Sequence, residues 1–155
     1  QRFLAGSTGS DLDTICRGQI WKEGLNYRCG TGHGVGFFLN VHEAPPNFRD
    51  RTGALEEGMF ITIEPGVYTE GSHGVRTENA VVVVKDIQTE YGQFYRFDTF
   101  TLVPIDTSCL DLELMTDDEL QWLNDYHQKV YQQVAPLVSE RAKNWLEQKT
   151  QPVTR

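Results

Sequence analysis

Four consecutive valines, from Val81 to Val84, constrain the fold more than any other part of the sequence. An unbroken apolar run of this kind is typical of a β-strand that is buried on both faces. Further β-prone runs extend from Met59 to Ile63 and from Phe100 to Ile105, and a shorter one covers 94–97. The sequence therefore predicts a sheet in which at least one strand is covered on both sides.

Helical patterns precede and follow these strands. Residues 10–23 place apolar side chains at helical spacing after a candidate N-cap, Ser10. Thr116 and Glu119 form a capping box ahead of an apolar stripe, which predicts a second helix. Pro136 interrupts that stripe, so a third helix is expected to run from there to about residue 149. The fold class that follows is α+β, with mixed strands followed by a helical C-terminal tail.

Composition excludes several classes of protein. The 155 residues carry a net charge of −8, with no cluster of Lys and Arg longer than two residues, so no nucleic-acid partner is expected. No apolar run approaches the roughly 18 residues that a membrane span needs, so no membrane partner is expected either. Three irregularly spaced cysteines do not form a disulfide framework, and they favour a cytoplasmic location. The chain starts at Gln1 with neither an initiator methionine nor a signal peptide, which indicates a piece of a longer protein.

Residues that could carry chemistry gather between positions 30 and 78. His33 has glycine on both sides, which lets the backbone approach a ligand closely, although a histidine among glycines is also a common turn residue. His42 follows nine residues later. Glu64 ends an apolar strand, where a buried carboxylate is costly unless it is paired or bound to a metal. Arg76 and Glu78 are expected on the same side of a strand, where they could equally form an ordinary surface ion pair.

Taken together, these side chains are typical of a metal site. Ligation by one imidazole and several carboxylates suits Mn²⁺, Co²⁺ or Zn²⁺ in a centre that activates water. Three protein ligands are too few for a pair of ions. For a pair of ions, this set of ligands is therefore incomplete.

The motifs around these residues resemble a known family. In chain order they are Gly-Thr-Gly-His-Gly-Val-Gly at 30–36, Asn-Val-His-Glu at 40–43, Glu-Pro-Gly at 64–66 and Arg-Thr-Glu-Asn at 76–79. They resemble the second half of the metallopeptidases that include methionine aminopeptidase, prolidase and aminopeptidase P. The fold of that family is called pita-bread, which implies a mixed antiparallel sheet with helices. Residues 39–43 and the tail segment 122–127 most resemble the Xaa-Pro aminopeptidases of the longer, cytosolic type. The resemblance extends from about residue 6 to residue 152.

The resemblance implies a dinuclear metal centre, usually with two Mn²⁺ ions, that hydrolyses the bond between an N-terminal residue and a following proline. By position in the motifs, His33 would bind one metal, and Glu64 would bind the same metal and act as general base. Glu78 would bridge both metals. His42 would have a catalytic role in contact with the substrate or the tetrahedral intermediate.

The resemblance also implies a substrate-binding surface and a missing part of the site. Tyr68 and Arg76 match positions that line the site and bind substrate. Two aspartate ligands of the family lie upstream, and Asp11 and Asp13 are in no matching motif, so both ligands are expected before Gln1. Cys29 stands where relatives often carry a histidine, and it is interpreted as a spacer in preference to a soft metal ligand.

These interpretations divide the chain into residues 1–110, the C-terminal half of a pita-bread catalytic domain, and residues 111–155, a helical extension that is expected to form a homodimer. The missing N-terminal part of the parent is a required partner. The chain alone is expected to fold poorly or to exist as part of a larger assembly, and to hydrolyse little. Two alternatives stay open: a prolidase or creatinase-like hydrolase, and a non-catalytic pita-bread module that binds proteins.

Overall fold

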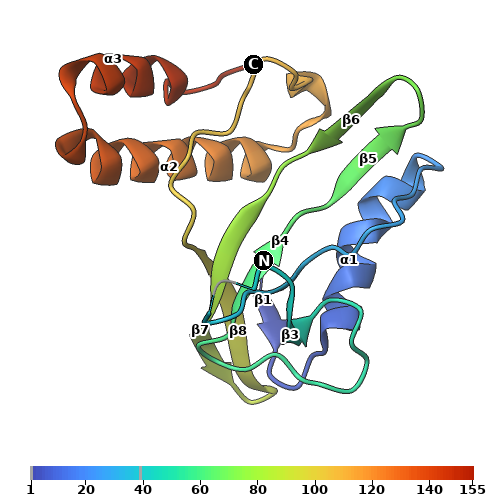
Figure 1. Ribbon diagram of the computed structural model, residues 1–155. Helices are drawn as coiled ribbons and strands as arrows, with labels where there is room; N and C mark the ends of the chain where they lie inside the picture. The colour runs from blue at the N-terminus through green and yellow to red at the C-terminus, as the bar shows by residue number, and fades with distance from the viewer. Residues whose placement is uncertain (1, 39) are drawn as a thin grey trace. The chain divides into compact units, whose positions relative to one another are not determined.

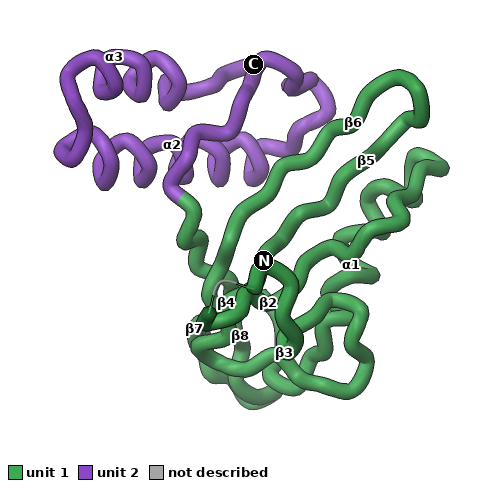
Figure 2. Tube along the Cα trace, viewed as in Figure 1, with its two compact units in different colours: residues 1–101 green, residues 102–155 purple. Residues whose placement is uncertain are grey.

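The computed structural model describes residues 2–38 and 40–155 (Figure 1). The chain divides into two compact units, residues 1–101 and residues 102–155 (Figure 2). The elements of the first unit are β1 (Arg2–Leu4), α1 (Gly9–Lys22), β2 (His33–Gly34), β3 (Glu43–Asn47), β4 (Phe60–Ile63), β5 (Gly66–Thr69), β6 (His73–Arg76), β7 (Asn79–Thr89) and β8 (Gly92–Thr99). Those of the second are η1 (Leu112–Leu114), α2 (Asp117–Val134), η2 (Ala135–Leu137) and α3 (Glu140–Lys149).

A six-stranded antiparallel sheet organises the first unit. Its strand order is β1-β8-β7-β4-β2-β3, and β5 and β6 form a separate two-stranded hairpin. The valine run lies in β7, where Val81 and Val83 are buried in the core and Val82 and Val84 are half-buried. The predicted burial on both faces is therefore complete on one face and partial on the other. The predicted strands at 81–84 and 94–97 are confirmed as parts of β7 and β8, and the one at 59–63 is confirmed as β4 except for Met59, which lies just before it.

Helix α1 occupies the predicted region, but its start differs from the prediction. Thr8, and not Ser10, is the N-cap, because Thr8 keeps an extended backbone and accepts the N–H of Asp11. The Asp11 side chain in return accepts the N–H of Thr8, which completes a capping box. The Ser10 N–H is already taken by the carbonyl of Asp50, so Ser10 lies inside the first turn.

The predicted strand from Phe100 to Ile105 is wrong. The N–H groups of Phe100 and Thr101 both bond to the carbonyl of Ala80, and the chain then leaves the sheet. Leu102 and Ile105 pack instead against the core of the helical unit. Their apolar character therefore reflects a second core and not a strand.

The second unit has its own small core. Tyr126, Val130, Ala135 and Leu146 are buried together there, and the capping box of Thr116 and Glu119 begins α2 as predicted. The third helix begins at Glu140 rather than at Pro136, because residues 135–137 form a 3₁₀ turn and the Ser139 side chain caps α3. Within the described residues, no helix combines the length and apolar character needed to cross a bilayer.

Candidate metal centre

Close backbone packing explains the glycines on both sides of His33. A Cβ atom on Gly32 would lie 1.8 Å from the carbonyl oxygen of Thr62 on β4. A Cβ atom on Gly34 would lie 2.4 Å from the carbonyl oxygen of Glu43 on β3. Glycine is the residue that permits such an approach. The motif therefore places β2 tightly between β3 and β4 and presents His33 at this point of the sheet.

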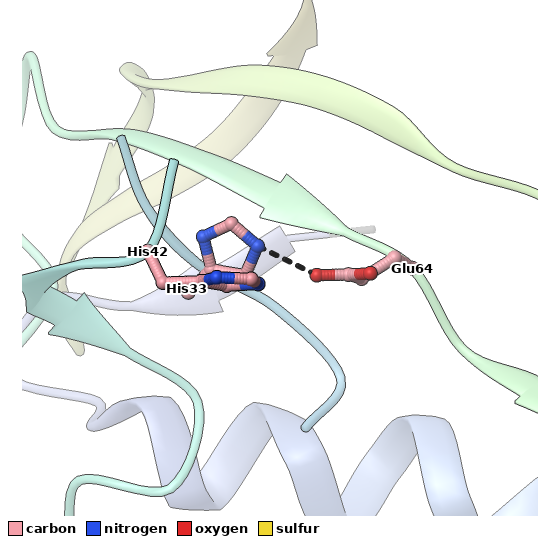
Figure 3. A group of neighbouring side chains, drawn as sticks. All are labelled: His33, His42 and Glu64. Carbon is pink, nitrogen blue, oxygen red and sulfur yellow. Dashed lines mark ion pairs between the residues drawn. The ribbon is translucent and has the colours of Figure 1, made fainter. Parts of the chain in front are cut away.

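Three of the predicted residues converge in space (Figure 3). His33 begins β2, His42 directly precedes β3, and Glu64 directly follows β4. Each offers one ligand atom, and these atoms all lie within 4.8 Å of one another. The Nε2 atom of His33 is 2.7 Å from Oε1 of Glu64, and the rings of His33 and His42 have centroids 4.3 Å apart. Neighbouring strands thus bring together two imidazoles and a carboxylate that are separated by up to 31 positions in the sequence.

The tautomer of His33 suits a metal ligand. Its Nδ1 atom is 2.8 Å from the carbonyl oxygen of Gly34, which only accepts hydrogen bonds, so Nδ1 carries the proton. Nε2, the other ring nitrogen, faces Glu64 and is the atom that a cation shared with this carboxylate would bind. A backbone carbonyl that fixes the ring in this way is the usual support of a metal-binding histidine. The donor set therefore fits a divalent cation.

The carboxylate of Glu64 is buried and fully partnered, with only 7% of the residue exposed. The Thr62 hydroxyl donates to Oε1 at 3.2 Å, and a guanidinium nitrogen of Arg76 lies 3.1 Å from Oε2. The backbone N–H of Glu64 donates to the carbonyl of Thr31 at 2.7 Å. The contacts from Thr62 and Arg76 offset the cost of burying the charge and orient both carboxylate oxygens, and the backbone bond to Thr31 fixes the main chain of Glu64.

A cavity of about 490 Å³ opens beside this cluster. Its charged and ligand-bearing lining residues are Cys29, His33, His42, Glu43, Arg49, Glu64 and Arg76. His42 is the exposed member of the converging trio, whereas Glu64 is buried. The cavity therefore has space for a small ligand next to a buried carboxylate, with an imidazole on the accessible side.

Glu78 does not join this cluster. Its side chain is exposed, and the converging group found among the described residues consists of His33, His42 and Glu64. The expectation that Arg76 and Glu78 share one face of a strand is wrong, because Arg76 ends β6 and β7 begins only at Asn79. Arg76 pairs instead with Glu64. Side-chain alternation along one strand cannot predict this pair, because the two residues belong to different elements.

The remaining predicted residues lie on the β5–β6 hairpin and at the cavity wall. Tyr68 is half-exposed on β5, and the guanidinium of Arg76 lies over its ring at 5.6 Å. The Cys29 thiol is half-buried, lines the cavity and lies 3.9 Å from a nitrogen of Arg76. It is not among the converging ligand atoms. Thr31 and Thr62 were not predicted as parts of the site. The available signals were the place of Thr31 between two motif glycines and that of Thr62 two residues before Glu64 on the same strand.

Comparison with known proteins identifies the family. The profile of metallopeptidase family M24 matches residues 2–85, and that of the C-terminal region of peptidase M24 matches residues 93–153. The chain is 43% identical to a probable Xaa-Pro aminopeptidase P of Coprinopsis cinerea, over 97% of this chain and 26% of that protein. It is 40% identical to Xaa-Pro aminopeptidase 1 of Dictyostelium discoideum, over 98% of this chain and 26% of that protein.

A solved structure agrees with these matches. The chain superimposes on the X-prolyl aminopeptidase of Caenorhabditis elegans with a TM-score of 0.90 and 39% identity, over 99% of this chain and 26% of that one. That protein is described as a cytosolic enzyme with a di-nuclear active site. The chain belongs to metallopeptidase family M24, and the predicted resemblance and pita-bread fold class are confirmed. It spans about a quarter of the length of the relatives that it matches.

Proposed function

We propose that this chain supplies part of the dinuclear metal centre of an Xaa-Pro aminopeptidase, an enzyme that hydrolyses the bond between an N-terminal residue and a following proline. The observation that carries the proposal is the convergence of His33, His42 and Glu64 within 4.8 Å beside a cavity. The names of the relatives over nearly the whole chain support the same activity.

In this proposal, His33 and Glu64 would hold one of the two ions, and Glu78 would contribute to holding both. The two remaining carboxylate ligands come from the part of the parent that precedes this chain. Mn²⁺ is the proposed metal, with Zn²⁺ or Co²⁺ as substitutes, because ligands of this kind are rich in oxygen and include one imidazole. When bound, the ions would supply a water molecule that ionises near neutral pH.

The residues of the chain then have separate tasks. Glu64 accepts the proton of the attacking water, and Thr62 and Arg76 hold its two oxygens in place for that transfer. His42, which is exposed at the cavity, contacts the substrate or the developing oxyanion. Tyr68 and Arg76 bind the peptide. Selection for proline depends on shape, because an amide nitrogen in the proline ring has no N–H to recognise.

The proposal extends to the organisation of the protein. Residues 1–110 form the second half of the catalytic domain, and residues 111–155 form an extension through which two copies associate. The parent acts in the cytoplasm on peptides with proline at the second position. The cytosolic description of the Caenorhabditis elegans relative supports this location.

The test uses the full-length parent with added Mn²⁺ and a peptide of the form Xaa-Pro-Xaa. Glu64→Gln keeps the size of the side chain but removes the charge, so it should weaken Mn²⁺ binding and lower kcat by roughly 10²- to 10⁴-fold. Glu57→Gln is the matched control, since Glu57 is a half-exposed residue paired with Lys85 away from the cluster. The control should leave both Mn²⁺ binding and turnover unchanged.

Other outcomes separate the alternatives. Normal turnover by Glu64→Gln would contradict the assigned role of Glu64. Cleavage of Xaa-Pro dipeptides with no cleavage of tripeptides would indicate a prolidase-like hydrolase. A parent that takes up no Mn²⁺, Zn²⁺ or Co²⁺ would indicate a non-catalytic module.

A further inference from the structure

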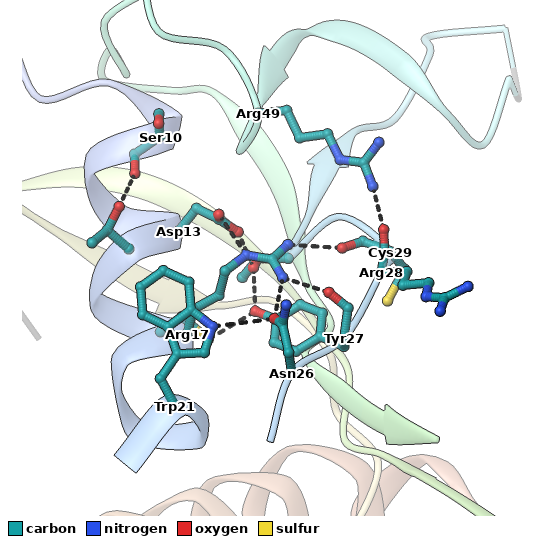
Figure 4. Close-up of polar contacts among 12 residues, drawn as sticks. Ser10, Asp13, Arg17, Trp21, Asn26, Tyr27, Arg28, Cys29 and Arg49 are labelled. Atoms are coloured by element: carbon teal, nitrogen blue, oxygen red, sulfur yellow. Dashed lines mark hydrogen bonds and ion pairs between the residues drawn. The ribbon is translucent and has the colours of Figure 1, made fainter. Parts of the chain in front are cut away.

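The segment that leads into the metal centre, residues 26–32, has no helix or strand of its own. Three successive carbonyl groups in it nevertheless have donors from arginine side chains (Figure 4). Arg17 on α1 donates to the carbonyl of Tyr27 at 2.7 Å and to that of Cys29 at 2.8 Å. Arg49 donates to the carbonyl of Arg28 at 2.7 Å. Side chains from outside the segment therefore determine the path of its backbone.

Arg17 is itself fixed on helix α1. Its Nε donates at 2.7 Å to the carboxylate of Asp13, one turn earlier, and the Arg17 side chain is only 12% exposed. The guanidinium lies over the Tyr27 ring, 3.9 Å from its centroid. A planar fork can reach two carbonyls and a carboxylate at once, which a lysine ammonium on its flexible stem does not reproduce.

Asp13 continues the network into the site. The Thr31 hydroxyl donates to the second oxygen of Asp13. The Tyr27 hydroxyl also bonds to Thr31, and burial raises the pKa of Tyr27 to about 12, so this phenol keeps its proton and acts as a donor. Thr31 is completely buried. Both its side chain and its backbone are thereby held in one position.

Thr31 connects this network to the ligands of the metal centre. Its carbonyl accepts the backbone N–H of Glu64 at 2.7 Å, and His33 lies two residues further along the chain. The His33 N–H in turn donates to the Thr62 hydroxyl at 3.1 Å. A displacement of residues 27–31 would therefore move the main chain at both His33 and Glu64.

We propose that Arg17, held by Asp13, is a positioning residue for the metal centre: it fixes residues 27–31 and, through Thr31, the relative position of His33 and Glu64. This inference rests on the metal-binding function proposed above. It assigns a role to Asp13, which matches no ligand motif of the family, as an outer support and not as a ligand. Outer groups that orient ligands commonly change metal affinity by about 10- to 100-fold when they are replaced.

The test compares Arg17→Lys with Arg96→Lys in the full-length protein. Arg96 is a partly exposed arginine on β8 that faces Asp86 and Asp98, so the control makes the same chemical change away from the site. Two quantities are measured: the Kd for Mn²⁺ by titration calorimetry, and amide hydrogen exchange in peptides covering residues 26–34, 60–66 and the β7 strand.

Arg17→Lys should raise the Kd for Mn²⁺ by about 10-fold or more, and should accelerate exchange in 26–34 and 60–66 while β7 stays protected. Arg96→Lys should change neither quantity. An unchanged Kd with unchanged exchange would overturn the proposal. Faster exchange in β7 to the same degree would also overturn it, because it would show a general structural role.

A second variant keeps the proposal testable if Arg17→Lys fails to fold. Asp13→Asn keeps an acceptor for the Thr31 hydroxyl but removes the charge that holds Arg17, so it should change the same two readouts in the same direction. An unchanged Kd and unchanged exchange in this variant would likewise overturn the proposal. Exchange needs no metal. If the unsubstituted protein bound no Mn²⁺, the proposed function would fail while the exchange data still decided the role of Arg17.

Discussion

Replacing Gly32 by alanine should damage the fold and the metal centre together. The added Cβ would lie 1.8 Å from the Thr62 carbonyl oxygen and 2.8 Å from a ring carbon of Phe48. Relief of the first contact alone requires β2 and β4 to separate locally by roughly 1 Å or more, in a closely packed interior. Overpacking of this kind costs about 1–3 kcal/mol. Loss of the His33 N–H bond to Thr62 adds about 1 kcal/mol.

The total, about 2–4 kcal/mol, corresponds to a fall in Tm of roughly 4–16 °C for a domain of this size. Thermal unfolding followed by circular dichroism measures it, and titration with Mn²⁺ in the full-length protein should show weaker binding. Gly18→Ala is the matched control. A Cβ on Gly18 meets nothing within 4 Å, and Gly18 lies inside α1, so alanine there should stabilise by up to about 1 kcal/mol. The reasoning is refuted if Gly32→Ala melts at or above the temperature of the unsubstituted protein.

Two further predictions concern the helices. Thr8→Ala should lower the free energy of unfolding by about 1 kcal/mol, whereas Ser10→Ala should change it much less, because Thr8 is the cap of α1; urea titration of both variants decides between them, and equal losses would contradict the assignment. Burial lowers the pKa of His127, whose Nε2 accepts the Ile105 N–H at 3.1 Å and whose Nδ1 has no partner within the described residues. The unfolded chain therefore binds a proton before the folded one as the pH falls below about 6.5. Neutral His127 should therefore contribute its full stabilisation to the second unit above about pH 6.5, and the unit should lose stability as the pH falls below this value. His127→Leu should flatten the pH dependence of Tm between pH 7 and 5, and an unchanged slope would refute the role of His127.

Local sequence patterns predicted those elements whose signal lies within a few residues. The capping box of Thr116 and Glu119 is such a case, because both partners lie in the same helical turn. The same holds for β7, where the valine run alone favours a strand. At α1 the N-cap lies two residues earlier than expected, because Thr8 forms a capping box with Asp11 while the Ser10 N–H bonds to the carbonyl of Asp50.

The strand prediction at 100–105 failed because an apolar residue there can be buried in either of two cores, that of the sheet or that of the helical unit. Leu102 and Ile105 read as a continuation of the strand pattern, yet they pack with the helical unit. Periodicity reports that a side chain is buried and does not report against what. The short strand β1 was missed for a related reason: it is defined by its pairing with β8 more than by its own residues.

For the candidate site, too, some features were predicted from local motifs and others were not. Motif resemblance placed His33, His42 and Glu64 in one site, and the structure brings their ligand atoms within 4.8 Å. The ion pair of Arg76 with Glu64 was not predicted, because it joins two different elements: Arg76 ends β6, and Glu64 directly follows β4. The roles of Asp13 and Arg17 were also invisible, since their contacts reach residues 27–31 in a segment without regular structure.

The class of fold, the order of the motifs and the chemical type of each candidate ligand could be predicted from the sequence, because they depend on residue identity and on spacing along the chain. Which groups meet became visible in the folded chain alone: the buried carboxylate of Glu64 with its three side-chain partners, the tight approach at Gly32, and the network around Arg17. Hydrogen bonds, charge pairing and steric exclusion act over only a few ångströms in space. Distance along the chain does not encode these contacts until strand pairing sets the register.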